Sequence, residues 1–217
     1  MMRLLWLTGA FVLGAIILLP LRVVLALGDA GLAARQVSGS LWSGQLADAA
    51  WRGVPLGDLA VGLAPLSLLS GAPRLGFEGP ALTGTAMADG VTGLSGAVDA
   101  SGHTPLPIGR VDLQNLSIRF AGRTCTAASG SVAVIATGPM ATALGGTLQG
   151  LVRCDAGALL LPLASATGQV QLRIDGNGGW QALITLASVG ETARPDLLAA
   201  GFAPTPQGLS RVLEGHL

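Results

Sequence analysis

The chain has 217 residues, of which 50% are apolar and only 11% are charged, against roughly a quarter charged in typical globular domains. The formal net charge is zero, and all twelve basic residues are arginine. Binding to phosphate backbones needs clustered Lys and Arg, so a zero balance without basic runs argues against nucleic acid as a partner. The length fits one domain plus a short appendage better than two full domains. Thirty-three Gly and twelve Pro favour short elements over long helices beyond the N-terminus.

The N-terminal segment is long and apolar enough to cross a membrane. Leu4–Leu21 contains no charged residue, and Arg22 is followed by the apolar stretch Val23–Leu27. Eighteen helical residues span roughly 27 Å, close to the hydrocarbon core of about 30 Å. A cleaved signal peptide is the alternative, but its apolar region has only about 7–15 residues. We expect an uncleaved anchor over residues 1–27, with a short cytoplasmic start, and a β domain over residues 28–217.

The two cysteines indicate which side of the membrane the body occupies, because the flanking arginines do not decide it. Cys125 and Cys154 each lie in a strand-like stretch, with no CxxC spacing and no nearby His to indicate a metal or redox site. They are compatible with a cross-strand disulfide, which persists only in an oxidising compartment. Two buried free thiols are the alternative. The disulfide predicts a cytoplasmic N-terminus and a body on an oxidising, periplasm-like side.

The sequence after this N-terminal segment predicts a series of short strands. From Gln169 to Asp175, Val170, Leu172 and Ile174 alternate with polar residues, which is the period of a half-buried strand. A Gly- and Asn-rich loop follows, and then a second strand over Trp180–Leu186. The pair predicts a β-hairpin.

A second stretch, Val111–Phe120, alternates with a slip in phase. Val111 and Leu113 fall on one parity, whereas Leu116 and Ile118 fall on the other. A β-bulge near Gln114 and Asn115 restores a common face. Further strands are expected over Gly39–Ala47, Leu56–Leu63, Ala81–Met87, Leu94–Asp99, Ser131–Thr137 and Thr147–Cys154. Their spacing predicts a mainly β fold, an antiparallel meander curved into an open barrel or sandwich and preceded by one transmembrane helix.

Helical signals in the body are few. Pro65–Ser70 predicts one short turn with Pro at its start. Asp196–Ala200 follows Pro195, offers Asp196 as a cap and ends at Gly201.

The most specific stretch of the sequence is Val37–Gly71, VSGSLWSGQLADAAWRGVPLGDLAVGLAPLSLLSG. It resembles the N protein of the bacterial type II secretion system, which carries a G-x-L-W-x-G strand after its anchor and an L-G-x-L strand leading to Pro and a Leu-rich turn. The matching positions are Gly39, Leu41, Trp42, Gly44, Leu56, Gly57, Leu59, Leu63, Pro65, Leu68, Leu69 and Gly71. The family often has Trp where this chain has Val61. Taken as residues alone, Gly39–Gly44 favours a core strand with close backbone approach over a recognition edge.

The resemblance implies an accessory component of the apparatus that exports folded proteins from the periplasm across the outer membrane. It implies a bacterial inner-membrane location, other inner-membrane subunits of the secretion platform as partners, and neither catalytic residues nor a cofactor. From the residues themselves, His103 and His216 lack evident catalytic or metal-binding partners, and no P-loop, nucleophile elbow or zinc motif appears. We therefore expect a scaffold that is not an enzyme.

A second hypothesis is lipid handling. The low charge and high apolar content of the β body also suit a sheet that carries lipid along a concave apolar face, and the anchor-plus-strands layout is similar to that of AsmA-like proteins. An open apolar trough favours this hypothesis, whereas a concave face filled by the protein's own side chains opposes it.

Overall fold

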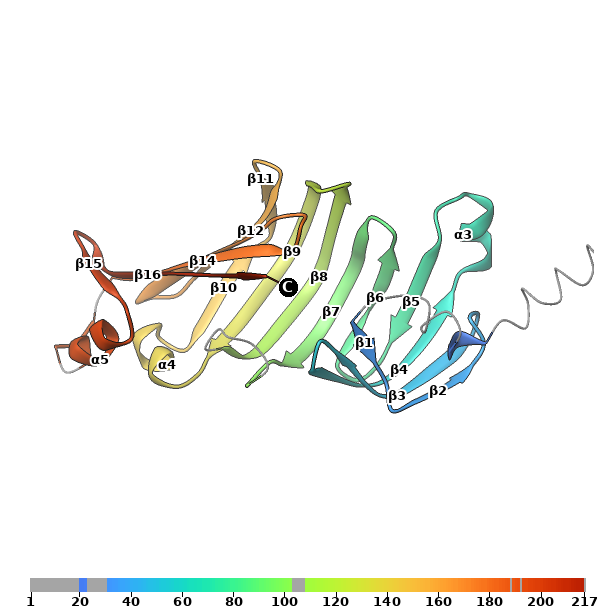
Figure 1. Cartoon of the computed structure of the whole chain (residues 1–217), viewed down its shortest axis with the longest axis horizontal. Coiled ribbons are helices and arrows are strands. Elements are labelled where there is room, and N and C mark those ends of the chain that lie inside the picture. Colours follow the sequence, from blue (N-terminus) through green and yellow to red (C-terminus); the bar gives the residue numbers. More distant parts are fainter. Residues whose placement is uncertain (1–19, 23–30, 103–107, 188, 192, 217) are drawn as a thin grey trace, which may run out of the picture. The chain divides into compact units, whose positions relative to one another are not determined.

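A computed structural model describes residues 20–22, 31–102, 108–187, 189–191 and 193–216. The chain divides into two compact units, Met1–Ala88 and Asp89–Leu217, which we call unit 1 and unit 2. The described residues of both units form mainly antiparallel strands (Figure 1). The predicted mainly β class with antiparallel pairing is therefore confirmed.

In its described residues, unit 1 is a meander with a short helix between β4 and β5. Its sheet has the order β1-β3-β4-β5-β6, and β2 also pairs with β3. The elements are β1 (Leu32–Ala33), β2 (Gln36–Gly39), β3 (Gly44–Trp51), β4 (Val54–Leu63), α3 (Pro65–Leu69), β5 (Arg74–Glu78) and β6 (Leu82–Met87).

The core of unit 1 includes the end of the N-terminal apolar run. Leu46, Leu59 and Val61 are buried on one face of β3 and β4, and Leu21 packs against them with only 2% of its surface exposed. Pro20 forms an isolated antiparallel bridge with Ser40. The last residues of the apolar run, Pro20 and Leu21, are thus held by β3, β4 and the turn before β3.

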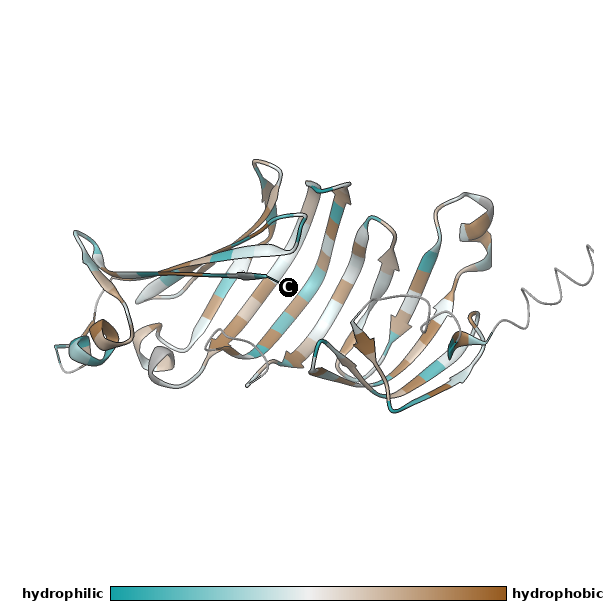
Figure 2. Cartoon of the chain, in the orientation of Figure 1, coloured by the Kyte–Doolittle hydropathy of each residue, from teal (hydrophilic) through white to brown (hydrophobic). Residues whose placement is uncertain are grey.

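Unit 2 is a longer meander whose strands have the order β7-β8-β9-β10-β12-β13-β14-β16-β15, with β11 beside β12. Its strands are β7 (Gly90–Asp99), β8 (Ile108–Ala121), β9 (Thr124–Ala136), β10 (Thr147–Leu151), β11 (Arg153–Asp155), β12 (Ala158–Ala164), β13 (Gly168–Ile174), β14 (Gly179–Leu186), β15 (Ala203–Thr205) and β16 (Gly208–His216). Two short helices, α4 (Pro139–Ala143) and α5 (Arg194–Ala199), lie in the connections. Hydrophilic and hydrophobic residues alternate along the strands (Figure 2).

The bulge predicted in β8 is present. The register of β8 shifts between Gln114 and Ser117 against β9. Asn115 has a φ of +48°, and its backbone N–H donates to Ser95 Oγ at 2.9 Å. Opposite it, Gly130 adopts a φ of +111°, and a Cβ there would lie 2.6 Å from Leu116 Cα. The bulge needs glycine at this position because any side chain would meet the backbone of β8.

The predicted hairpin is β13–β14, paired from Gly168↔Leu186 to Ile174↔Trp180. Its loop is closed by Asp175, whose Oδ1 accepts hydrogen bonds from the N–H of Asn177 at 2.8 Å and of Gly179 at 2.9 Å. This Asx-type turn supplies the chain reversal that the Gly- and Asn-rich loop predicted.

Three details of the strand prediction are wrong. The expected strand over Gly39–Ala47 is divided by a turn at residues 40–43, and that over Thr147–Cys154 is divided between β10 and β11. Strands β1, β5, β12, β15 and β16 were not expected. Val152 is buried between β10 and β11, and its N–H donates to Gly130 O at 3.1 Å. The break in the strand thus coincides with the bulge across the sheet.

Both predicted helices are found at their expected positions, but the N-cap predicted for the second helix is wrong. Residues 65–69 form α3 with Pro at its start. In α5 the helix begins at Arg194, so Asp196 lies in the first turn, and Ala193 is the N-cap without a side-chain hydrogen bond. Asp196 still suits this turn because a carboxylate is favoured near the helix N-terminus.

The predicted disulfide is formed between Cys125 of β9 and Cys154 of β11, with a Cα–Cα distance of 5.5 Å, within the range usual for the bond. Cys125 also donates its backbone N–H to Gly157 O at 2.7 Å. These contacts fasten the β11–β12 hairpin to β9. Cys125 is buried and belongs to the main apolar cluster of unit 2.

The predicted transmembrane helix falls on residues 1–27, most of which lie outside the described part of the chain. Within the described residues, no helix is long and apolar enough to cross a bilayer.

Removal of the disulfide is expected to destabilise unit 2. Cys125→Ala/Cys154→Ala should lower the free energy of unfolding by about 3–4 kcal/mol, because the bond closes a loop whose ends are 29 residues apart. Urea unfolding followed by circular dichroism measures the change. Reductant should lower the stability of the natural chain and leave the double variant unaffected. Equal stability of the reduced and oxidised natural chain would contradict the prediction.

Candidate apolar binding site

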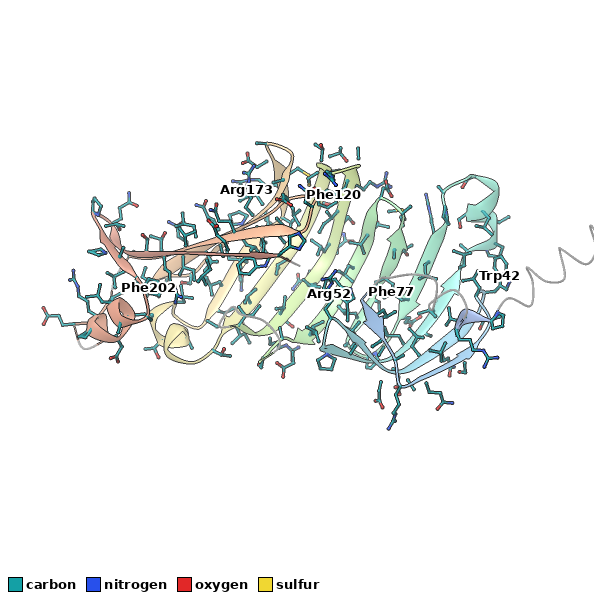
Figure 3. All side chains as sticks on the ribbon, in the orientation of Figure 1. Trp42, Arg52, Phe77, Phe120, Arg173 and Phe202 are labelled. Carbon is teal, nitrogen blue, oxygen red and sulfur yellow. A yellow bond between two sulfur atoms is a disulfide. The ribbon has the colours of Figure 1, made fainter. Side chains whose placement is uncertain are left out.

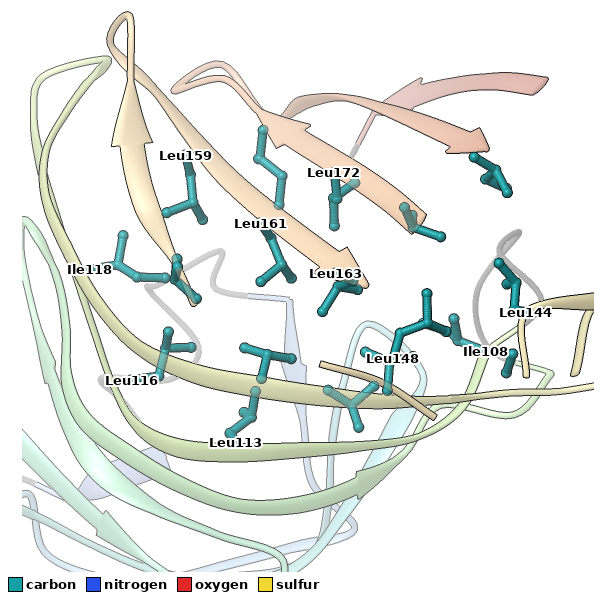
Figure 4. Close-up of a pocket in the computed structure, with 18 residues that line it drawn as sticks. Ile108, Leu113, Leu116, Ile118, Leu144, Leu148, Leu159, Leu161, Leu163 and Leu172 are labelled. Atoms are coloured by element: carbon teal, nitrogen blue, oxygen red, sulfur yellow. The ribbon is translucent and has the colours of Figure 1, made fainter. Parts of the chain in front are cut away.

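The inner face of the unit 2 sheet holds an apolar pocket of about 280 Å³ (Figure 4). Eighteen side chains from six strands and two connections line it, and every one is aliphatic. They are Ile108, Val111, Leu113, Leu116, Ile118, Val132, Val134, Ala136, Leu144, Leu148, Val152, Leu159, Leu161, Leu163, Val170, Leu172, Ile174 and Ile184.

The curl of the sheet creates the pocket. Leu159, Leu161 and Leu163 of β12 point toward Leu113 and Leu116 of β8 across the space (Figure 4). Alternate residues of a strand share one face, so each strand contributes every second side chain. The bulge in β8 corrects the phase slip, and residues on both sides of it therefore line the same pocket.

The pocket lacks the groups that chemistry needs and suits an apolar guest. Empty cavities lined by Leu, Ile and Phe stay dry, and one of about 150 Å³ binds benzene. At about 30 Å³ for a group the size of a water molecule, the pocket has room for an alkyl segment of roughly eight to ten carbons. Ten of the fifteen buried residues of the unit 2 cluster line the pocket, so the same side chains form the core and surround the space. The inner face is thus not completely filled by the protein's own side chains.

One cation lies on the same face as the pocket. Arg211 of β16 is directly opposite Ile184 of β14, and Ile184 lines the pocket. Cross-strand partners share a face of the sheet. Arg211 is half-buried, and the salt bridges formed among the described residues do not include it. A guanidinium there can donate hydrogen bonds to a carboxylate or phosphate.

The sequence predicted neither a metal site nor a cluster of catalytic residues. Among the described residues, no group of three or more His, Cys, Asp or Glu is placed to hold a metal ion. His216 is exposed at the end of β16, and His103 lies outside the described residues.

The first half of the sequence motif builds a tight hairpin in unit 1. Gly39 and Gly44 are paired across the β2–β3 turn. Gly39 has a φ of +82°, and a Cβ on Gly44 would collide with Leu21. Leu41 packs against the unit 1 core, and Trp42 is half-buried in the turn. The expected close backbone approach is present, but in a turn rather than in a continuous strand.

The second half of the motif forms β4 and the corner after it. Leu56 and Leu59 pack in the unit 1 core, and Gly57 occupies the register shift between β3 and β4 with a φ of +75°. The remaining positions lie at the corner, where Leu63 ends β4, Pro65 starts α3 and Gly71 follows α3 with a φ of +70°. Leu68 is in the exposed part of α3, and Leu69 belongs to the same helix.

The motif and the pocket lie in different units. All the motif positions belong to unit 1, whereas the pocket lining belongs to unit 2. Sequence reasoning therefore missed the pocket as a site, although it found several of the strands that line it. The apolar run Ala158–Leu161 beside the alternating Gln169–Asp175 was the available signal. It could not show that the strands curl onto β8.

Comparison with known proteins assigns the chain to one family. A family model described as type II secretion system protein N matches residues 30–203, which include the motif, both cysteines and the whole pocket lining. No curated protein and no solved structure gives a significant match. Because the match covers most of the chain, the protein belongs to the type II secretion system protein N family.

Proposed function

We propose that this chain is a non-enzymatic accessory scaffold of the type II secretion apparatus, held in the bacterial inner membrane with its β body in the periplasm. Family membership is the observation that carries the proposal. In it, residues 1–27 form the anchor, with a cytoplasmic N-terminus, and residues 28–217 form the periplasmic part. The Cys125–Cys154 disulfide supports the orientation, because such bonds persist in oxidising compartments.

Anchoring explains how a scaffold acts without a large interface. Confinement to the membrane raises the effective concentration of the β body near other inner-membrane subunits of the secretion platform. A weak contact then suffices to keep the partners together.

An edge strand of unit 2 supplies a contact of this kind. β15 covers β16 only over Gly208–Ser210, so among the described strands Arg211–Glu214 pairs on one side alone, with β14. Val212 in this stretch is 50% exposed. An open edge accepts an extended strand from a partner through main-chain hydrogen bonds.

The scaffold proposal predicts that secretion depends on the apolar N-terminal segment. With residues 1–27 replaced by a cleavable signal, release of folded exoproteins should fall several-fold, because the body is no longer concentrated at the platform. The measurement is the share of exoprotein in the medium compared with that in the periplasm, and a chain carrying an unrelated single-pass anchor is the control. Full secretion by the released body would contradict the proposal.

The edge contact predicts site-specific cross-linking. A photo-reactive amino acid replacing Val212 should cross-link to another inner-membrane subunit of the platform in cells. The same amino acid replacing Ile135 is the matched control, since Ile135 is 40% exposed but lies in β9, which pairs with β8 and β10. Equal cross-linking from both positions, or none from position 212, would exclude this edge.

The pocket favours a second candidate function, the binding of a single-chain amphiphile. The aliphatic lining suits one alkyl tail, and Arg211 on the same face suits an anionic head. The pocket volume is too small for both tails of a phospholipid. Binding would therefore involve a fatty acid or one tail of a larger lipid.

Photo-labelling with a twelve-carbon diazirine fatty acid tests this candidate. Leu161→Trp fills the pocket and should reduce labelling of unit 2 at least five-fold. Leu183→Trp is the control, because Leu183 adjoins Ile184 on β14 and is 37% exposed, away from the pocket. Equal labelling of both variants and the natural chain, mapped by mass spectrometry, would rule out the pocket as the binding site.

A further inference from the structure

The corner between β4 and β5 in unit 1 exposes leucine where a protein in water is normally polar. Leu66 is 78% exposed and Leu68 is 43% exposed, both on α3. No charged residue occurs between Asp58 and Arg74. Single exposed leucines are ordinary on protein surfaces, so the argument depends on how this corner is built and where it lies.

Several polar groups of the corner are hydrogen-bonded within it. Ser67 is buried, and its hydroxyl donates to Ala64 O at 2.5 Å and accepts from the Arg74 N–H at 3.0 Å. Ser70 Oγ donates to Ser67 O at 2.8 Å. The N–H of Gly71 donates to Leu68 O at 3.1 Å.

The buried Ser67 hydroxyl thus points inward while Leu66 and Leu68 face outward, the reverse of a surface loop in water. Backbone and hydroxyl groups that enter a bilayer must find partners within the protein, because lipid tails provide none. Since the hydroxyls of Ser67 and Ser70 already have partners within the loop, apolar surroundings would not cost these groups their hydrogen bonds.

The corner lies at the same end of unit 1 as the end of the N-terminal apolar run. The Leu63 N–H donates to Leu41 O at 3.0 Å, and a Cβ on Gly62 would lie 2.8 Å from Trp42 O. The preceding residue of that turn, Ser40, bridges to Pro20. Figure 3 shows Trp42 at this end of unit 1, and Figure 1 shows α3 beyond β4.

We propose that α3 inserts Leu66 and Leu68 into the interface of the inner membrane, next to the N-terminal anchor. The inference rests on the proposed anchoring, because Leu4–Leu21 brings this end of unit 1 to the bilayer. The membrane is the occupant that the position favours, since an apolar run of spanning length ends at Leu21 in the same unit. Unit 1 then contacts the bilayer at two points, which fixes its orientation rather than leaving it free to turn about one anchor.

The flanking residues fit the same location. Trp is enriched at the level of lipid headgroups, and Trp42 lies in the turn beside the corner. Arg22 and Arg74 are both exposed, one at the end of the apolar run and one at the start of β5, which follows the corner. Arginines at such positions attract anionic headgroups.

The test uses the full chain in nanodiscs of phosphatidylethanolamine and phosphatidylglycerol, with Leu66→Cys carrying the environment-sensitive fluorophore NBD. Cys125 and Cys154 are bonded to each other and remain unlabelled without reductant. Leu151→Cys is the matched control, because Leu151 is also leucine and is 69% exposed, but belongs to unit 2. Leu68→Cys provides a second position in case Leu66→Cys fails to fold.

Nitroxide-labelled lipid should quench NBD at position 66 at least five-fold more strongly than at position 151, and iodide in the buffer should show the opposite order. Iodide quenching as strong as at position 151 would overturn the inference. So would protection from both quenchers, which would indicate a second copy of the chain on the corner. Failure of the chain to enter the nanodisc would overturn the anchoring as well, whereas a chain that enters with position 66 in water would overturn only the insertion of α3.

Discussion

The bulge at Asn115 is the constraint on which the inner face of unit 2 depends. Side chains in a strand alternate between faces, so a long strand whose apolar residues change parity would expose half of them. The extra residue in β8 returns Leu116 and Ile118 to the face that holds Val111 and Leu113. Gly130 makes the bulge possible, because its missing side chain lets the neighbouring strand approach the displaced backbone.

The curvature of the same sheet then determines which side chains face one another inside unit 2. An antiparallel sheet with one apolar face must cover that face, and unit 2 does so by folding β12–β14 over β8–β10. The cover leaves a small aliphatic space and one arginine on the same face. The disulfide closes one side of this arrangement by fastening the β11–β12 hairpin to β9. The core of unit 2 and its aliphatic space are thus built from the same strands.

Unit 1 has a different physical character. Its core is small, includes Leu21 from the end of the N-terminal run, and is organised by the glycine-rich motif. The motif residues shape a tight turn and a corner; they do not form a pocket. Their spacing is explained by backbone geometry, since Gly39, Gly57 and Gly71 all adopt positive φ. The corner that they produce presents leucine outward and lies beside the turn at residues 40–43.

The sequence alone determined the β class, the β13–β14 hairpin, the position of the bulge, the cysteine pair and the family, because each of these is written in local periodicity, turn residues or a short motif. It did not determine that Gly39–Ala47 turns back on itself, that β12 follows the second cysteine, or that Asp196 is not a cap. Tertiary structure decided which apolar strands face one another, and therefore that a pocket exists at all. The reason is physical: alternation assigns a residue to a face of its own strand, whereas the space between two faces depends on sheet curvature and on strands far apart in the chain.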